Sequence, residues 1–167
     1  MARASIASGV ASVEELRRSP GYPSRTRLKA GPVAVIECVE DIPCNPCEAA
    51  CPHGAIRVGK PITRLPVLDE KKCTGCGRCI PACPGLAIFV VDATYSEAEA
   101  AVSMPYEFLP LPKKDAAVDA LDRAGKRVCS GRVVRVSCLP RNRGTAVVTI
   151  AVPKAYAEQV RGFRVRG

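Results

Sequence analysis

The stretch that decides the fold is Cys73-Thr-Gly-Cys76-Gly-Arg-Cys79-Ile-Pro-Ala-Cys83-Pro84. It has the C-x2-C-x2-C-x3-C-P spacing that surrounds a cubane iron-sulfur cluster. Three thiolates at this spacing on a tight loop can reach three corners of one cube, whereas the fourth begins a helical turn and points away. The motif therefore predicts a 4Fe-4S site, and electron transfer becomes the leading functional hypothesis.

A second cysteine run lies upstream and repeats this scheme with a longer first loop. It reads Cys38-x5-Cys44-x2-Cys47-x3-Cys51-Pro52. We expect it to supply a partner site. The longer loop leaves two interpretations of Cys38 open: a cluster ligand, or a strand-end cysteine with the site completed otherwise.

The repeat continues beyond the cysteines, since Cys51-Pro-His-Gly-Ala-Ile-Arg-Val58 resembles Cys83-Pro-Gly-Leu-Ala-Ile-Phe-Val90. Each copy has the pattern of an apolar strand, a cysteine loop, one or two helical turns and another apolar strand. The expected strands are residues 33–36, 55–58, 67–69 and 88–91. An internal pseudo-twofold relation follows.

Residues 33–92 resemble a bacterial-type ferredoxin with two 4Fe-4S clusters. The resemblance implies an α+β, ferredoxin-like fold in which the fourth cysteine of each run ligates the cluster of the other run. Carried over to this sequence, it assigns one cluster to Cys38, Cys44, Cys47 and Cys83, and the other to Cys73, Cys76, Cys79 and Cys51.

Structural zinc and a disulfide framework are the alternatives for these cysteines. Structural zinc uses C-x2-C pairs separated by a longer stretch, so a third closely spaced cysteine followed by C-P has no use there. A disulfide framework is disfavoured because the start of the chain lacks the continuous apolar stretch of a secretory leader.

The remaining sequence predicts two flanking regions, 1–32 and 93–167, around the cluster region 33–92. In the first, Ser12-Val-Glu-Glu15 is a capping box that opens a short helix to about Arg18. In the second, we expect a short helix over 96–102, then strands over 127–138 and 145–152 that form a small β-rich docking domain. Its Cys129 and Cys138 are interpreted as ordinary small residues rather than a third metal site.

Charge and motifs narrow the function. The net charge is +9, but the basic side chains lie in the flanks, with Arg161, Arg164 and Arg166 as a basic tail and Arg141 and Arg143 around a turn. These patches lack interleaved aromatic residues, so nucleic-acid binding is the less favoured hypothesis and an acidic partner face explains them as well. No catalytic triad, acid-base pair or phosphate loop is present. His53, beside a cysteine, could tune a cluster but is first of all expected to be a surface residue.

A closer resemblance covers the chain from about Ser19 onward. Ile36-Glu-Cys-Val-Glu-Asp-Ile-Pro-Cys-Asn-Pro-Cys-Glu-Ala-Ala-Cys-Pro52, Pro66-Val-Leu-Asp69 and Pro105-Tyr-Glu-Phe-Leu-Pro-Leu-Pro112 resemble ferredoxin-type small subunits of flavin-dependent amino-acid dehydrogenases of the proline and hydroxyproline type. No window of the sequence nears the length of a transmembrane helix, so we expect a cytoplasmic chain with no membrane span. The resemblance implies a soluble hetero-oligomer. There a flavin subunit oxidises the amine and this chain carries single electrons without a catalytic site of its own. A free-standing ferredoxin with appendages and a nucleic-acid module with structural clusters are the alternatives.

Charges near the two runs predict an order of reduction potentials. Acidic residues surround the first run (Glu37, Glu40, Asp41 and Glu48), and basic residues surround the second (Lys71, Lys72 and Arg78). Because reduction adds negative charge, the cluster on Cys73, Cys76 and Cys79 should have the higher potential.

Overall fold

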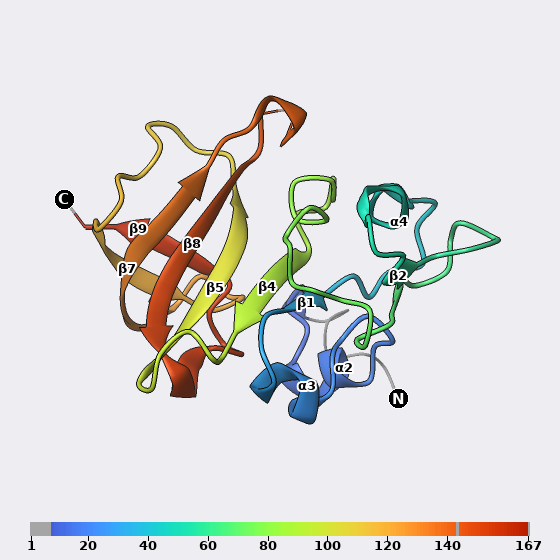
Figure 1. Cartoon of the computed structure of the whole chain (residues 1–167), viewed down its shortest axis with the longest axis horizontal. Coiled ribbons are helices and arrows are strands. Elements are labelled where there is room, and N and C mark those ends of the chain that lie inside the picture. Colours follow the sequence, from blue (N-terminus) through green and yellow to red (C-terminus); the bar gives the residue numbers. More distant parts are fainter. Residues whose placement is uncertain (1–7, 143, 167) are drawn as a thin grey trace.

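The computed structural model describes residues 8–142 and 144–166, and a seven-stranded antiparallel sheet is its main element (Figure 1). The strand order is β1-β4-β5-β8-β7-β6-β9. The strands are β1 (Val33–Ile36), β4 (Ile88–Asp92), β5 (Glu99–Tyr106), β6 (Ala117–Leu121), β7 (Arg127–Ser137), β8 (Ala146–Pro153) and β9 (Gly162–Val165). A separate pair, β2 (Ile56–Arg57) and β3 (Val67–Leu68), lies among the cysteine loops. Strands thus form in all four of the segments expected around the cysteine runs.

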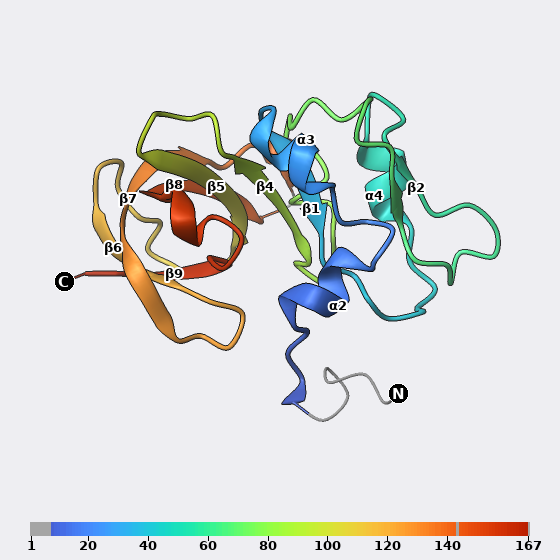
Figure 2. The same ribbon diagram turned by 90° about the horizontal axis from the view of Figure 1, so that it is seen from below.

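The sheet curls around the turn η2 (Lys154–Tyr156), as Figure 2 shows. Ala157 and Val160, which follow this turn, are buried in the main core. The strands expected over 127–138 and 145–152 are confirmed as β7 and β8, which pair with each other. The boundary expected at residue 92 falls at the end of β4. Because β1 and β4 belong to the same sheet as β5 to β9, this boundary lies within one continuous sheet. The division into 1–32, 33–92 and 93–167 stays a prediction.

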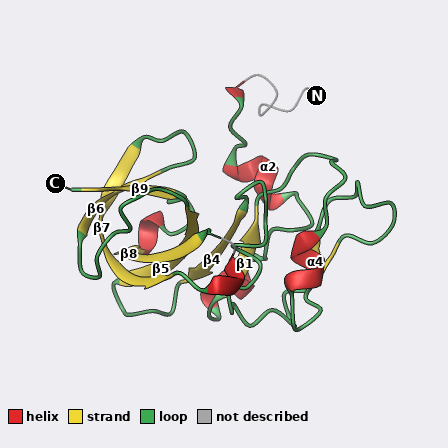
Figure 3. Ribbon diagram, turned by 90° about the horizontal axis from the view of Figure 1, so that it is seen from above, coloured by secondary structure: helices red, strands yellow, loops and turns green. Residues whose placement is uncertain are grey.

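Helices are short, as the colouring by secondary structure shows (Figure 3). The helices that lie wholly within the described residues are α2 (Val13–Arg17), α3 (Arg25–Lys29), α4 (Pro46–Ala50) and, besides η2, the 3-10 turn η1 (Pro140–Asn142). Helix α2 confirms the capping box: Ser12 Oγ accepts from the Glu15 amide, and the Glu15 carboxylate accepts from the Ser12 amide. No helix in the described residues is long and apolar enough to cross a bilayer.

The described part of the N-terminal extension packs on the sheet, so over these residues it is not the extended arm expected from the sequence. Leu16, Tyr22 and Leu28 are buried in the main core with Val33 and Val35 of β1. Helix α3 was not expected from the sequence, because Arg-Thr-Arg-Leu-Lys offers a single apolar residue, and that residue is the one buried.

Strands β1 and β4 form a wall shared by two cores. Successive strand residues point to opposite faces, so Val33, Val35, Phe89 and Val91 enter the main core, whereas Ala34, Ile36, Ile88 and Val90 enter a second core beside the cysteines. The register pairs Ile36 with Ile88 and Val33 with Val91. Strand β1 leads into Cys38 and β4 follows Cys83, so these two neighbouring strands connect the cysteine loops to the rest of the sheet.

The helix expected over 96–102 is wrong. This segment enters β5, which pairs with β4 on one side and β8 on the other. Ala100, Val102 and Met104 alternate into the main core, and this strand-period burial overrides the helix propensity of alanine and glutamate.

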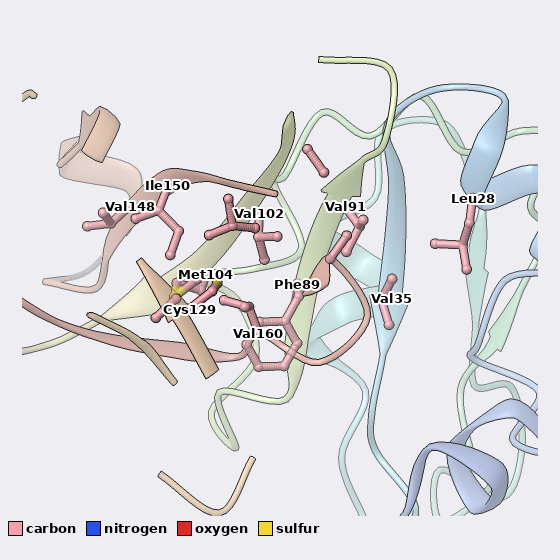
Figure 4. Packing of buried hydrophobic residues seen from close by; sticks show 14 of the residues in the cluster. Leu28, Val35, Phe89, Val91, Val102, Met104, Cys129, Val148, Ile150 and Val160 are labelled. Atoms are coloured by element: carbon pink, nitrogen blue, oxygen red, sulfur yellow. The ribbon is translucent and has the colours of Figure 1, made fainter. Parts of the chain in front are cut away.

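Figure 4 shows the main core, in which Val102, Met104, Cys129, Val148 and Ile150 from neighbouring strands converge with Val160 and Phe89. Cys129 is 8% exposed, and Cys138 is exposed beyond the end of β7. Among the described residues, neither joins a group of three or more potential ligands that could hold a metal ion.

Candidate iron-sulfur centre

The structure brings Cys38, Cys44 and Cys47 together with Cys83 of the other run. Burial, followed by the neighbouring Cys83 and Cys44 thiols, raises the pKa of Cys47 to about 11. Burial also raises the pKa of Cys38, and the same two neighbours add to this effect. These mutual influences define the first thiol group: Cys38, Cys44, Cys47 and Cys83.

Cys51 lies on the other side, with the second run. Burial, with further contributions from Cys73, Cys76 and Cys51, raises the pKa of Cys79 to about 12. These cysteines line one small cavity, which Ala34, Ile56 and Val90 of the second core close from the sheet side. They form the second thiol group: Cys51, Cys73, Cys76 and Cys79.

Backbone amides already point at three of these sulfurs. The Ala55 amide donates to Cys51 Sγ at 3.2 Å, and the Ala87 amide donates to Cys83 Sγ at 3.4 Å, four residues after the cysteine in each repeat. The Ala34 amide of β1 donates to Cys73 Sγ at 3.3 Å. Amide hydrogen bonds of this kind stabilise thiolates and tune the potential of a bound cluster.

The donor set fits a cubane better than a single ion. No three His, Cys, Asp or Glu side chains among the described residues converge closely enough to hold one metal ion. Zn–S bonds of about 2.3 Å would put four thiolates only roughly 4 Å apart, whereas a cubane binds each thiolate at a different iron. Four cysteines are also the ligands that 4Fe-4S clusters take.

Both thiol groups reach one groove between the cysteine loops and the outer face of the sheet. The groove measures about 770 Å³ and is lined by Cys76 and Cys83, by Ser103 and Thr149, which share a 2.8 Å hydrogen bond, and by Arg135. Cys76 is exposed. Electrons could therefore enter or leave both groups from this side.

Sequence reasoning missed a buried ion-pair network next to the first thiol group. Arg161, expected in an exposed basic tail, is instead 9% exposed, and its Nε donates to Glu37 Oε1 at 2.6 Å. Arg123 Nε donates to Glu37 Oε2 at 2.8 Å. No signal in the sequence separates these arginines from exposed ones, because the three residues meet only through the curl of the sheet.

The other two arginines of the expected basic tail, Arg164 and Arg166, are exposed. Arg166 is exposed and pairs with Asp119, whose pKa is lowered by Arg127 and Arg166. Arg143 and the side chain of Arg141 lie outside the described residues. His53 is exposed at the rim of the cavity of the second thiol group.

Comparison with known proteins agrees with the cysteine geometry. Residues 37–87 match the family described as 4Fe-4S dicluster domain. The chain is 41% identical over 64 residues to a subunit of an ion-translocating oxidoreductase complex of Methanosarcina acetivorans, and the match covers 38% of this chain and 23% of that protein. It is 50% identical over 38 residues to a subunit of the Na⁺-translocating ferredoxin:NAD⁺ oxidoreductase complex of Acetobacterium woodii, covering 23% of this chain and 11% of that protein.

A further relative is the polyferredoxin-like subunit of aliphatic sulfonate oxidoreductase from Pyrococcus furiosus, 46% identical over 48 residues, which are 29% of this chain and 27% of that protein. The chain thus spans about a quarter or less of the length of these curated relatives. No solved structure matches it significantly. The match and the eight thiols together show that residues 37–87 of this chain are a 4Fe-4S dicluster ferredoxin domain.

Proposed function

We propose that this chain is an iron-sulfur electron-transfer subunit of an oxidoreductase complex. The observation that carries the proposal is the gathering of eight cysteines in two groups of four: Cys51 lines one cavity with Cys73, Cys76 and Cys79, and Cys83 and Cys44 are the neighbours that act on Cys38 and Cys47. The names of the three relatives, all subunits of oxidoreductases, support it.

In this proposal the first thiol group and the second thiol group each hold one 4Fe-4S cluster. When bound, each cluster accepts and releases one electron at a time. The chain's own residues bind and orient: Ala34, Ala55 and Ala87 present amides to the sulfurs, and Ile36, Ile56 and Ile80 keep water from the second core.

The donor is proposed to be a flavin-containing subunit that oxidises an amino acid or another amine, in a cytoplasmic hetero-oligomer. A paired oxidation at a flavin suits two one-electron carriers in one chain. The groove beside Cys76 and Cys83 offers the approach, and Glu107 also lines it. Phe108 and Leu109, which follow Glu107, are 74% and 86% exposed, and protein interfaces bury apolar side chains of this kind. This chain then contributes no catalytic site.

Anaerobic purification of the chain tests the cluster assignment directly. We expect brown protein with about eight iron and eight sulfide per chain, reducible by dithionite, as two cubanes with four cysteine ligands each require. Colourless protein, or tightly held zinc in place of iron, would end the proposal. Purification from the native host should also yield a flavin-containing partner; a chain that is always recovered alone would instead favour a free ferredoxin.

Cys76 and Cys138 are both exposed, so their substitution by serine gives a matched test and control for the proposed ligands. Cys76→Ser should remove the second cluster and halve the iron content, whereas Cys138→Ser should leave it unchanged, because Cys138 lies beyond the end of β7 and outside both groups. Cys83→Ser tests the crossed arrangement. It should abolish the cluster of the Cys38 run and retain that of its own run, and the reverse would refute the crossing.

A further inference from the structure

The end of β1 sends two adjacent side chains to opposite sides of the shared wall. Val33 and Val35 face the main core, and Ala34 and Ile36 face the cysteines. Glu37 continues the first row, because it meets Arg123 and Arg161 from the C-terminal half. Cys38 continues the second row and packs against the second core. The Glu37 side chain held on one side of the wall is therefore one peptide bond away from the Cys38 thiol on the other side.

Glu37 is fixed tightly. Its side chain is 9% exposed, and those of Arg123 and Arg161 are 12% and 3% exposed. Arg161 lies over the Phe89 ring at 5.1 Å and also donates to the carbonyls of Ala157 and Val160. A largely buried carboxylate beside one buried and one partly buried cation is costly to leave unpaired, so these side chains have little freedom to move apart.

The backbone of Glu37 is also linked to Cys83, the member of the first thiol group that comes from the second cysteine run. Its amide donates to the Ala87 carbonyl at 2.8 Å, and the Ala87 amide donates to Cys83 Sγ at 3.4 Å. One residue thus holds both Cys38, through the next peptide bond, and Cys83, through Ala87.

The N-terminal flank holds the second thiol group in a similar way. Arg27 Nη2 donates to the carbonyls of Cys73 and Pro32, both at 2.8 Å, and its Nε donates to the Glu70 carbonyl at 2.9 Å. Arg27 thereby ties Glu70 and Cys73, at the start of the second cysteine run, to Pro32 before β1, and Cys73 also accepts a hydrogen bond from the Ala34 amide of β1.

We propose that each flank positions one thiol group: Arg27 positions the second group at Cys73, whereas Arg123 and Arg161, acting through Glu37, position the first group at Cys38 and Cys83. The flanks are then parts of the two cluster sites rather than appendages. The inference rests on the proposed function, since it concerns how the thiols hold their clusters.

Proteins that hold only one of the two clusters show which thiol group a substitution affects. The Cys76→Ser protein retains the first cluster and the Cys44→Ser protein retains the second. In the Cys76→Ser protein, Glu37→Gln and Arg161→Met should speed iron release to a chelator by about threefold to tenfold, while Arg27→Met leaves it unchanged. The range corresponds to roughly one kcal/mol of lost positioning. In the Cys44→Ser protein the pattern should invert.

The midpoint potential of the first cluster provides a second measurement, because a mere loosening of the protein would not shift it in opposite directions in two variants. Glu37→Gln removes a negative charge beside the first group and Arg161→Met removes a positive one, so the midpoint potential of the first cluster should rise in one variant and fall in the other. Asp119→Asn, which breaks the exposed contacts to Arg127 and Arg166, is the matched control and should change neither release nor potential.

The outcomes separate the two proposals. Equal effects of all three substitutions on both single-cluster proteins, or no effect on either, would overturn this inference while leaving the cluster assignment intact. Iron-free parent protein would refute the proposed function itself. Should Arg161→Met not fold, Arg123→Gln at the more exposed partner gives the same prediction with a smaller change.

Discussion

Leu86 holds the same left-handed backbone as Gly54, which occupies its position in the other repeat: their φ angles are 53° and 59°. Each residue immediately precedes the alanine whose amide donates to a cysteine sulfur. The left-handed residue thus accompanies the amide-to-sulfur hydrogen bond in both repeats, whether that residue is glycine or leucine.

Gly54→Ala should therefore destabilise the protein by about 1–2 kcal/mol, the cost of a left-handed side-chain residue. An added Cβ meets no atom within 4 Å, so backbone conformation is the whole effect. Leu86→Gly should stay within about 1 kcal/mol of the parent, because relief of strain offsets lost apolar contact. Anaerobic thermal unfolding measures both; an unchanged midpoint for Gly54→Ala would contradict this explanation of the turn.

Gly75 is the one glycine of the cysteine loops at which a side chain would collide with backbone in the described structure. Its added Cβ would lie 2.5 Å from Pro32 Cβ and 2.7 Å from the Pro32 carbonyl carbon, and its φ is 68°. Gly75→Ala should displace the loop between Cys73 and Cys76. Because the second cluster needs all four of its thiolates, the variant should lose that cluster, and its iron content should fall by about half. Gly85→Ala, with open space and ordinary φ, is the control and should retain full iron.

Removal of the clusters should unfold the cysteine loops but not the sheet. Low aromatic content suggests that the cluster region depends on its clusters for stability, yet the main core contains Val102, Val133, Val148 and Ile150, all 0% exposed. After chelation, we expect amide protons of β5, β7 and β8 to stay protected from exchange and those of residues 38–85 to lose protection. Loss of protection throughout would mean that the sheet needs the clusters as well.

The order of reduction potentials stays a prediction, and the structure reduces the number of charges on which it rests. Glu37 does not act as a free anion, since two arginines neutralise it, and Lys72 is paired with Asp69 at 3.1 Å. The exposed Arg78 beside Cys79 and the exposed Glu40 and Asp41 beside Cys38 still favour a higher potential at the second group. Potentiometric EPR on the Cys76→Ser and Cys44→Ser proteins gives the order, and a higher potential in the former would contradict it.

The exposed apolar pair Phe108 and Leu109, next to Glu107 of the groove, should matter mainly for association. Phe108→Ser and Leu109→Ser remove side chains that are 74% and 86% exposed, so iron content should not change, and thermal unfolding should change only slightly, through the lost edge-to-face contact of Phe108 with Tyr106. Recovery of the flavin-containing partner from the native host should fall several-fold, because interface anchors carry much of the binding energy. Val165→Ser, at the exposed end of β9, is the control; equal recovery of partner with all three would exclude this face.

The sequence by itself determined the chemistry of the cysteine runs and the places of most strands. Cysteine spacing is local, so the C-x2-C-x2-C-x3-C-P motif specifies a cubane without reference to the rest of the chain. The capping box at Ser12 and the valine-rich β7 and β8 were likewise readable, because hydrogen bonds and alternation over a few residues define them.

Only the tertiary structure decided which residues far apart in the chain meet. Residues 99–102 have helix-forming composition but lie between β4 and β8, and the gain from burying Ala100 and Val102 in a sheet exceeds that local preference. From the sequence, Arg161 was expected to belong to an exposed basic tail. The curl of the sheet instead brings it into contact with Glu37, from which it is separated by 124 positions in the sequence. Such pairings depend on strand order and register, which no local pattern encodes, and they give the flanks their place beside the two thiol groups.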